Sequence, residues 1–409
     1  MYFSDDVAFE EADRIRGHAV RALFLLSGAT DVYTETGRPG LLRAALAQWD
    51  DMVAGKTYFT GGVSSRHEDE AFGEPFELPP DHAYCETCAA IASIMWNWRL
   101  LLVTGEARFA ELIERTLYNG FLAALGFDGE SFYYVNPLQN RAPVGRRPWY
   151  RCACCPPNIM RLIASLGHYI ATSTDSGVQI HQFVSGRVST HTAQGGKLEF
   201  ELTTGYPDEG TLALRVLEAP AGGCELAVRV PAFAPGVSAT LNGKPAPSEP
   251  GSDRYLRVRR SWEPGDELTV EFPLPVRTIH PDPRIDAVRS CVAFERGPLV
   301  YCFEGVDVPG GDGLRGVSLP ADAKPSERHG LDVAGESVTA LSVPAQASAP
   351  RRSGWPYSAV PHSPGAPADG AAGPSTPVEL TAIPYYARAN RGDTDMRVWV
   401  PAGDAGKAP

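Results

Sequence analysis

Apolar residues in the first part of the chain recur every three or four positions, which is the period of an amphipathic helix. The spacing appears in five segments, at 15–26, 42–52, 91–102, 109–117 and 159–166. Pro156 and Pro157 precede the last segment, and proline suits the first turn of a helix because that turn needs no donated N–H. The pattern predicts five or six helices over residues 1–175.

The apolar period changes to two from about Gly177 onward, as it does in half-buried strands. Alternating segments lie at 178–183, 197–202, 211–216, 226–230 and 268–272. Turns that contain proline or glycine separate them, which predicts a β-sandwich domain over 176–280. We expect a second β-rich region over 281–409. It is interrupted at about 343–377 by a Pro-, Ala-, Ser- and Gly-rich stretch that is expected to be a flexible or PPII insertion.

The composition of the chain is ordinary for a globular protein with several domains, because 43% of its 409 residues are hydrophobic and 21% are charged. A net charge of −12 argues against nucleic acid or anionic membrane as a partner. No apolar run reaches the roughly 18 residues that span a bilayer. The first residues lack a secretory signal pattern, so clustered cysteines favour metal binding in a reducing cytoplasm over disulfides.

Five of the eight cysteines lie in two short segments, 85–88 and 152–155, and Glu86 lies among them. Thiolates together with a carboxylate are ligands that Zn²⁺ takes in a tetrahedral site. Spacing alone leaves two ligand sets open. One combines Glu86 with three cysteines. The other is a structural zinc held by Cys85, Cys88, Cys152 and Cys155, because Cys-x-x-Cys is itself a common zinc spacing.

Five motifs in the chain carry a family resemblance. They are Thr60-Gly61-Gly62, Glu70-Ala71-Phe72, Glu86-Thr87-Cys88-Ala89-Ala90-Ile91, Tyr134-Val135-Asn136-Pro137-Leu138 and Cys154-Cys155-Pro156-Pro157-Asn158. In these motifs the chain resembles glycoside hydrolase family 127, the zinc-dependent β-L-arabinofuranosidases that were once classified as a domain of unknown function. The resemblance runs in order from about Gly17 to Pro401.

The resemblance implies that the helical region belongs to an (α/α)₆ barrel that is followed by β-sandwich regions. A faint repeat of helix, glycine turn and helix, at Thr36-Gly37 and again at Thr104-Gly105, suits the stacked hairpins of such a barrel. Family members carry a long helical region before the position where this chain begins. We therefore expect that residues 1–175 are the C-terminal part of the barrel and that about half of it is absent.

Carried over residue by residue, the resemblance implies that Glu86, Cys88, Cys154 and Cys155 bind zinc. It also implies that Cys154 is the nucleophile, where a retaining glycosidase ordinarily uses a carboxylate, because zinc holds a thiol deprotonated at neutral pH. The plainer interpretation is that all three thiolates are inert ligands. Cys85 departs from the family, which usually has a small non-ligand residue there, and so introduces a competing ligand.

Glu70 matches the general acid/base of the family, which protonates the leaving oxygen and then deprotonates water. Its neighbours Glu68 and Asp69 make an acidic surface loop the plainer interpretation. His18 matches a sugar-binding histidine, although a lone histidine on a helix is more often a core or capping residue. Tyr134 is expected to stack on or hydrogen-bond the sugar, and a buried structural tyrosine is the alternative.

The expected function is that of a cytoplasmic, zinc-dependent, retaining glycoside hydrolase. Its partner would be a carbohydrate, from which it releases β-linked L-arabinofuranose, with no nucleic acid or membrane involved; a homo-oligomer is left open. The first alternative is an inactive or carbohydrate-binding zinc-containing remnant of such an enzyme. The second is a zinc hydrolase that uses a metal-bound water and leaves Cys154 unmodified.

Overall fold

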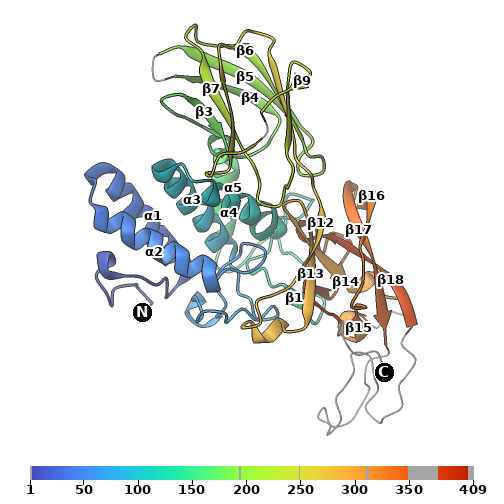
Figure 1. The fold of residues 1–409 in the computed structure, drawn as a ribbon. Helices are drawn as coiled ribbons and strands as arrows, with labels where there is room; N and C mark the ends of the chain where they lie inside the picture. Colours follow the sequence, from blue (N-terminus) through green and yellow to red (C-terminus); the bar gives the residue numbers. More distant parts are fainter. Residues whose placement is uncertain (1, 193–194, 248, 310–312, 349–375, 404–409) are drawn as a thin grey trace. The chain divides into compact units, whose positions relative to one another are not determined.

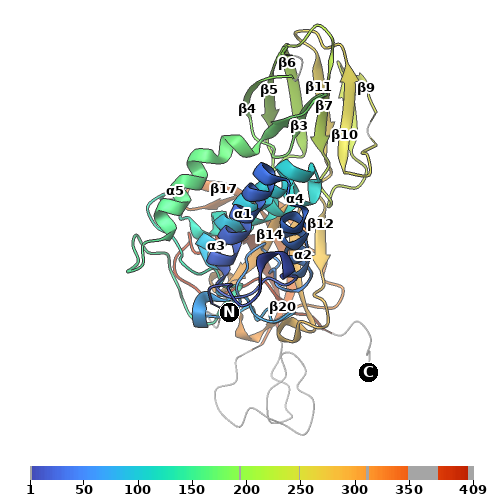
Figure 2. The same cartoon turned by 90° about the vertical axis from the view of Figure 1, so that its left-hand side faces the viewer.

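The computed structural model describes residues 2–192, 195–247, 249–309, 313–348 and 376–403 (Figures 1 and 2). These residues form two compact units. The first comprises Met1–Ala92, Thr116–Cys155 and Val276–Pro409, and the second comprises Ser93–Arg115 and Pro156–Pro275. Helices and β-sheets both contribute, so the expected mixed helical and β-rich multidomain architecture is confirmed.

The five helices that the apolar spacing predicts are all present. They are α1 (Ala19–Thr36), α2 (Pro39–Gly55), α3 (Thr87–Thr104), α4 (Ala107–Arg115) and α5 (Cys155–Ser165). Gly37 ends α1 in the left-handed conformation with φ 67°, and Pro39 stands in the first turn of α2. These two residues explain the tight turn between the helices, because glycine tolerates positive φ and proline starts a helix well.

Helix α3 differs from the sequence expectation in one respect. By length and composition alone it is apolar enough to cross a membrane. However, 67% of that segment is buried inside the protein, and Ile91 and Leu100 are fully buried. The core helix of a soluble protein passes the same test, so the apolar character of α3 is accounted for by its burial.

A ten-stranded sheet belongs to the first unit. Its main order is β1-β19-β14-β18-β17-β15; β13 pairs with β12, β14 and β20, and β16 pairs with β17. The strands are β1 (Gln139–Asn140), β12 (Val276–Ile279), β13 (Cys291–Arg296), β14 (Leu299–Glu304), β15 (Val317–Ser318), β16 (Ser326–Val333), β17 (Glu336–Ala347), β18 (Thr376–Pro384), β19 (Met396–Arg397) and β20 (Val400–Pro401). One hydrophobic cluster contains Cys85, Leu138, Cys302 and Tyr385, so segments far apart in the chain share a core.

The expected insertion at about 343–377 is shorter than its composition indicates. Residues 343–347 lie in β17 and residues 376–377 lie in β18, and the two strands pair there. Val343 and Ala345 are buried, so their alternation carries strand information that a count of Pro, Ala and Ser overlooks. Residues 349–375 lie outside the described part of the chain.

The second unit contains two further sheets, with the orders β10-β7-β3-β2 and β4-β5-β6-β11-β8-β9. Their strands are β2 (Ala171–Ser173), β3 (Gly177–Ile180), β4 (Gly186–His191), β5 (Lys197–Thr204), β6 (Thr211–Glu218), β7 (Cys224–Arg229), β8 (Ser238–Leu241), β9 (Lys244–Pro245), β10 (Tyr255–Arg260) and β11 (Glu267–Glu271). Alternate residues such as Leu198, Phe200 and Leu202 are buried, which confirms the period of two. The sheets form two layers in Figure 1.

A buried ion pair joins α4 to β7 within the second unit. Arg229 is 0% exposed; its guanidinium pairs with Glu114 and donates to the His181 carbonyl at 2.7 Å. Tyr206 donates a second hydrogen bond to Glu114 at 2.8 Å. A buried carboxylate is tolerated only when it is paired in this way.

We predict that Arg229→Met destabilises the protein by about 3–5 kcal/mol, because it leaves the buried Glu114 charge without its partner. Chemical denaturation measures this change. Arg259→Met on the neighbouring strand is the matched control, since Arg259 is exposed and its loss should cost less than about 0.5 kcal/mol. Equal stability of the two variants would show that the pair contributes nothing.

Candidate active site and metal centre

Two helix starts supply the residues of the candidate metal centre. Glu86 directly precedes α3, and Cys88 lies in its first turn. Cys154 directly precedes α5, and Cys155 is its first residue. The N-terminal end of a helix carries partial positive charge, so it favours thiolates and carboxylates at these positions.

The four side chains converge. One ligand atom from each of Glu86, Cys88, Cys154 and Cys155 lies within 4.8 Å of all the others. Cys88 Sγ is 3.5 Å from Cys155 Sγ, Cys154 Sγ is 3.7 Å from Cys155 Sγ, and Cys154 Sγ is 3.4 Å from Glu86 Oε1. A tetrahedral zinc with Zn–S bonds of about 2.3 Å holds two sulfurs about 3.8 Å apart, and a sulfur and an oxygen about 3.5 Å apart. These three distances therefore match such a site, and the remaining pairs lie within 4.8 Å.

The electrostatics of the cluster also fit a cation. Glu86 is 3% exposed, and its Oε2 has no hydrogen-bond partner among the described residues. Burial, with the nearby Cys154 thiolate and Glu70, raises the pKa of Glu86 to about 9. Hydrogen bonds from Cys155 and Cys88 hold the pKa of Cys154 well below its usual range. The raised pKa of Glu86 means that these groups can be ionised together at neutral pH only beside a positive partner, and a divalent metal would supply it.

Cys85 and Cys152 do not join this cluster. Cys85 has a positive φ of 39°, and its buried side chain belongs to the hydrophobic cluster that contains Tyr58 and Leu78. Cys152 is exposed. The structure therefore does not bring the four-cysteine set together. Gly62 lies against Cys85, since a Cβ built on Gly62 would be 2.8 Å from Cys85 Sγ, which gives the Gly61-Gly62 motif a packing role.

Glu70 lies beside the candidate metal-binding cluster. It belongs to the short 3-10 turn Glu68–Glu70, where both Asp69 and Glu70 have positive φ. Its Oε2 is 3.1 Å from His18 Nε2, and its carboxyl also interacts with the side chains of Glu86 and Tyr84. The neighbours Glu68 and Asp69 instead line a separate cavity of about 290 Å³. The strained turn thus selects one carboxylate of three for the site.

Tyr134 lies next to Cys154, and its hydroxyl is 3.4 Å from Cys154 Sγ. Its ring is in edge contact with Tyr84, at 6.2 Å between centroids, and lies 5.8 Å from Tyr150. The structure therefore brings together His18, Glu70, Tyr134 and the four cluster residues. Sequence reasoning missed Tyr84 and Tyr150, and the only available signal was that each lies within a few residues of a clustered cysteine.

Family models match nearly the whole chain. The catalytic-domain model of glycoside hydrolase family 127, described as β-L-arabinofuranosidase, matches residues 1–168. The middle-domain model matches residues 177–274, and the C-terminal-domain model matches residues 276–401.

Individual relatives agree with these matches. A curated non-reducing end β-L-arabinofuranosidase of Bifidobacterium longum subsp. longum is 33% identical over 96% of this chain and 61% of its own length. The crystal structure of a family 127 β-L-arabinofuranosidase from Geobacillus stearothermophilus T6 matches with a TM-score of 0.88 and 34% identity, over 98% of this chain and 63% of that one. The structure of a second family 127 β-arabinofuranosidase matches with a TM-score of 0.88 and 33% identity, over 98% of this chain and 62% of that one. The chain thus spans about three fifths of the length of these relatives.

We predict that the purified protein carries about one zinc per chain and that Cys88→Ser removes most of it, because the variant loses one of four convergent ligands. Elemental analysis measures the zinc content. Cys85→Ser and Cys152→Ser are matched controls that should keep the metal, since neither side chain lies in the cluster. Loss of zinc from Cys85→Ser together with retention in Glu86→Gln would instead favour the four-cysteine set.

Proposed function

The chain belongs to glycoside hydrolase family 127, and from that premise we propose that it is a zinc-dependent, retaining hydrolase that releases β-linked L-arabinofuranose from plant-type glycans. The observation that carries the proposal is the proximity of Cys154 and Glu70. Both approach Glu86, the thiolate through its sulfur at 3.4 Å and Glu70 through its carboxyl. A nucleophile and an acid next to one metal cluster suit glycoside cleavage.

In this proposal residues 1–175 are the C-terminal part of an (α/α)₆ barrel, residues 176–280 a β-sandwich, and residues 281–409 a second β-rich region, in a cytoplasmic protein. Glu86, Cys88, Cys154 and Cys155 hold the zinc. When bound, zinc keeps the thiolates deprotonated at neutral pH and eases departure of the sulfur.

The reaction has two steps. Cys154 Sγ attacks the anomeric carbon, a C–S bond forms, and the glycosidic C–O bond breaks while Glu70 donates a proton to the leaving oxygen. Glu70 then removes a proton from water, whose oxygen attacks the anomeric carbon and releases the Cys154 thiolate. Two displacements at one carbon retain its configuration.

The neighbours of the two reacting groups have supporting roles. His18 Nε2 lies 3.1 Å from Glu70, so it orients the carboxyl and is near enough to contact a sugar that Glu70 protonates. The Tyr134 hydroxyl lies 3.4 Å from Cys154 Sγ, where it stabilises a thiolate and faces the same sugar. Burial raises the pKa of the Tyr84 phenol, and the adjacent Glu70 carboxyl raises it further. The tyrosine therefore stays neutral.

We predict that Glu70→Gln and Cys154→Ser fail differently. Glu70→Gln should keep the zinc and lose about 10²–10⁴-fold in rate on poor leaving groups, because acid assistance is gone. Activated aryl β-L-arabinofuranosides need less assistance, so their glycosylation should suffer less. Cys154→Ser should abolish turnover and disturb the metal, because one residue has both roles. Steady-state rates on both substrate types, with zinc analysis, measure these outcomes.

Glu68→Gln is the matched control, since Glu68 lies in the same turn but lines the separate cavity. If Glu70→Gln lowered the rate equally and only slightly on both substrate types, Glu70 would not be the general acid. An unmodified Cys154 after treatment with a thiol-directed sugar epoxide would favour a metal-bound water as nucleophile. Sugar binding without any turnover by the wild-type chain would favour the carbohydrate-binding alternative.

A further inference from the structure

Arg388 is a buried cation on the loop that follows β18. It is 2% exposed, and the guanidinium hydrogen bonds that it makes to the described residues go to neutral acceptors rather than to a carboxylate. Its guanidinium instead donates to the Pro137 carbonyl at 2.8 Å, to the Tyr385 hydroxyl at 2.6 Å and to Asn136 Oδ1 at 2.9 Å. Burying an arginine against neutral acceptors is costly. The Tyr133 and Tyr385 rings, whose centroids lie 4.6 and 4.3 Å from the guanidinium carbon, offset part of this cost.

Asn136 transmits the contact toward the metal cluster. Because a guanidinium only donates, Arg388 fixes the Asn136 amide with its oxygen toward the arginine. The amide nitrogen must then face the opposite way, where it donates to the Cys85 carbonyl at 3.0 Å and to Thr87 Oγ1 at 3.0 Å. The two acceptors belong to the residues before and after Glu86 in the chain. One amide group therefore fixes the backbone on both sides of this cluster residue.

The turn that Asn136 holds is strained. Cys85 has positive φ, which disfavours a residue with a Cβ, so surrounding contacts must maintain it. The Cys85 N–H donates to the Ser64 carbonyl at 3.0 Å, and the Thr87 N–H donates to the Tyr134 carbonyl at 3.0 Å. The strained backbone turns the Cys85 side chain into the core while Glu86 and Cys88 face the cluster. Any relaxation of this turn moves two of the four cluster residues.

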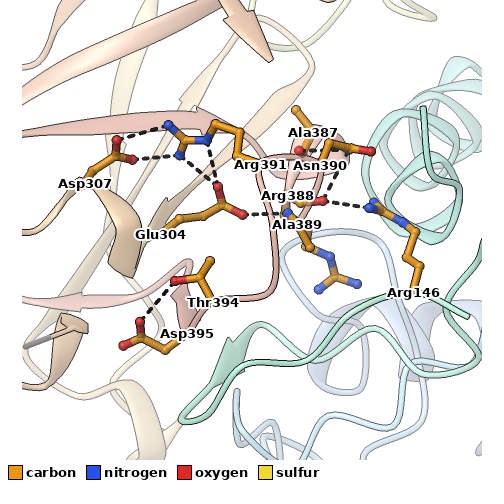
Figure 3. Close-up of polar contacts among 10 residues, drawn as sticks. All are labelled: Arg146, Glu304, Asp307, Ala387, Arg388, Ala389, Asn390, Arg391, Thr394 and Asp395. Atoms are coloured by element: carbon orange, nitrogen blue, oxygen red, sulfur yellow. Dashed lines mark hydrogen bonds and ion pairs between the residues drawn. The ribbon is translucent and has the colours of Figure 1, made fainter. Parts of the chain in front are cut away.

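The loop that carries Arg388 is itself fixed at several points (Figure 3). Arg391 pairs with both Glu304 and Asp307, and Glu304 also accepts from the Ala389 N–H. Arg146 donates to the Arg388 carbonyl at 2.8 Å. In Figure 3 the Arg388 guanidinium points away from the Arg391 pair. The loop therefore presents Arg388 from a rigid base on the ten-stranded sheet.

We propose that Arg388 is a positioning residue for the metal centre, which it shapes by fixing the Asn136 amide and, through it, the 85–87 turn. The proposal rests on the proposed function only in taking Glu86 and Cys88 as zinc ligands. Loss of a group that is hydrogen-bonded directly to a metal ligand typically weakens metal binding about 10–100-fold, and this range is the upper bound for Arg388, which acts through Asn136.

The test uses the full chain with Arg388→Lys, which keeps the charge but not the forked donor. Arg229→Lys is the matched control, because Arg229 is just as buried but belongs to the second unit. Asn136→Asp is the second variant, because it keeps an acceptor for Arg388 and removes the donor to Cys85. Zinc affinity is measured by competition with a chromophoric chelator, and ligand geometry by the absorption spectrum of the Co²⁺-substituted protein.

Arg388→Lys and Asn136→Asp should each weaken zinc binding, by about 10-fold and at most about 100-fold, and alter the Co²⁺ spectrum. The double variant should be non-additive, since both residues act along one path. Arg229→Lys should change neither readout, even if it lowers stability. Wild-type affinity and spectrum in Arg388→Lys would overturn the proposal. If Arg388→Lys does not fold, Asn136→Asp gives the same decision.

Amide hydrogen exchange separates this proposal from the proposed function. Faster exchange at the Cys85 and Thr87 amides in Arg388→Lys than in Arg229→Lys supports the positioning role whether or not zinc is bound. A wild-type chain that binds no zinc would overturn the proposed cofactor, while exchange would still decide the role of Arg388. Unchanged exchange at both amides would overturn the positioning role alone.

Discussion

One electrostatic constraint dominates the first unit: Glu86 and three cysteine sulfurs lie within 4.8 Å of one another in a largely buried position. Ionised groups so close repel each other and lose hydration. The fold answers this in two ways. It starts two helices at the cluster, whose N-terminal ends favour negative charge. It also leaves Glu86 Oε2 without a hydrogen-bond partner among the described residues, so a cation is the natural partner.

The cluster residues converge only because segments that are far apart in the chain contact one another. Residues 86–88 and 154–155 approach each other because the chain between them returns through Tyr134 and Val135, the latter bridged to Glu86. The 134–138 segment is held in turn by Tyr385 and Arg388. The ten-stranded sheet, to which these two residues are joined through β18, is built largely from residues after 275, so the C-terminal part of the chain supports the candidate site.

Much of this could be predicted from the sequence because it depends on local pattern. A period of three to four gave the five helices, a period of two gave the strands of the second unit, and clustered cysteines indicated the metal centre. Spacing could not tell which of the two four-residue sets converges, because Cys85 leaves the cluster through a positive φ that turns its side chain into the core. Nor could it reveal Arg388, whose effect depends on contacts with residues about 250 positions away.

The same reasoning explains why Glu70 stands out from its acidic neighbours. Three consecutive carboxylates share one turn, and composition treats them alike. Positive φ at Asp69 and Glu70 directs Glu70 toward His18, Tyr84 and Glu86, while Glu68 and Asp69 line a separate cavity. A strained backbone thus places Glu70 beside the cluster, just as it turns Cys85 away from it. In both places strain in a short turn is maintained by distant contacts, which is how a site can be rigid although its residues lie on loops and helix ends.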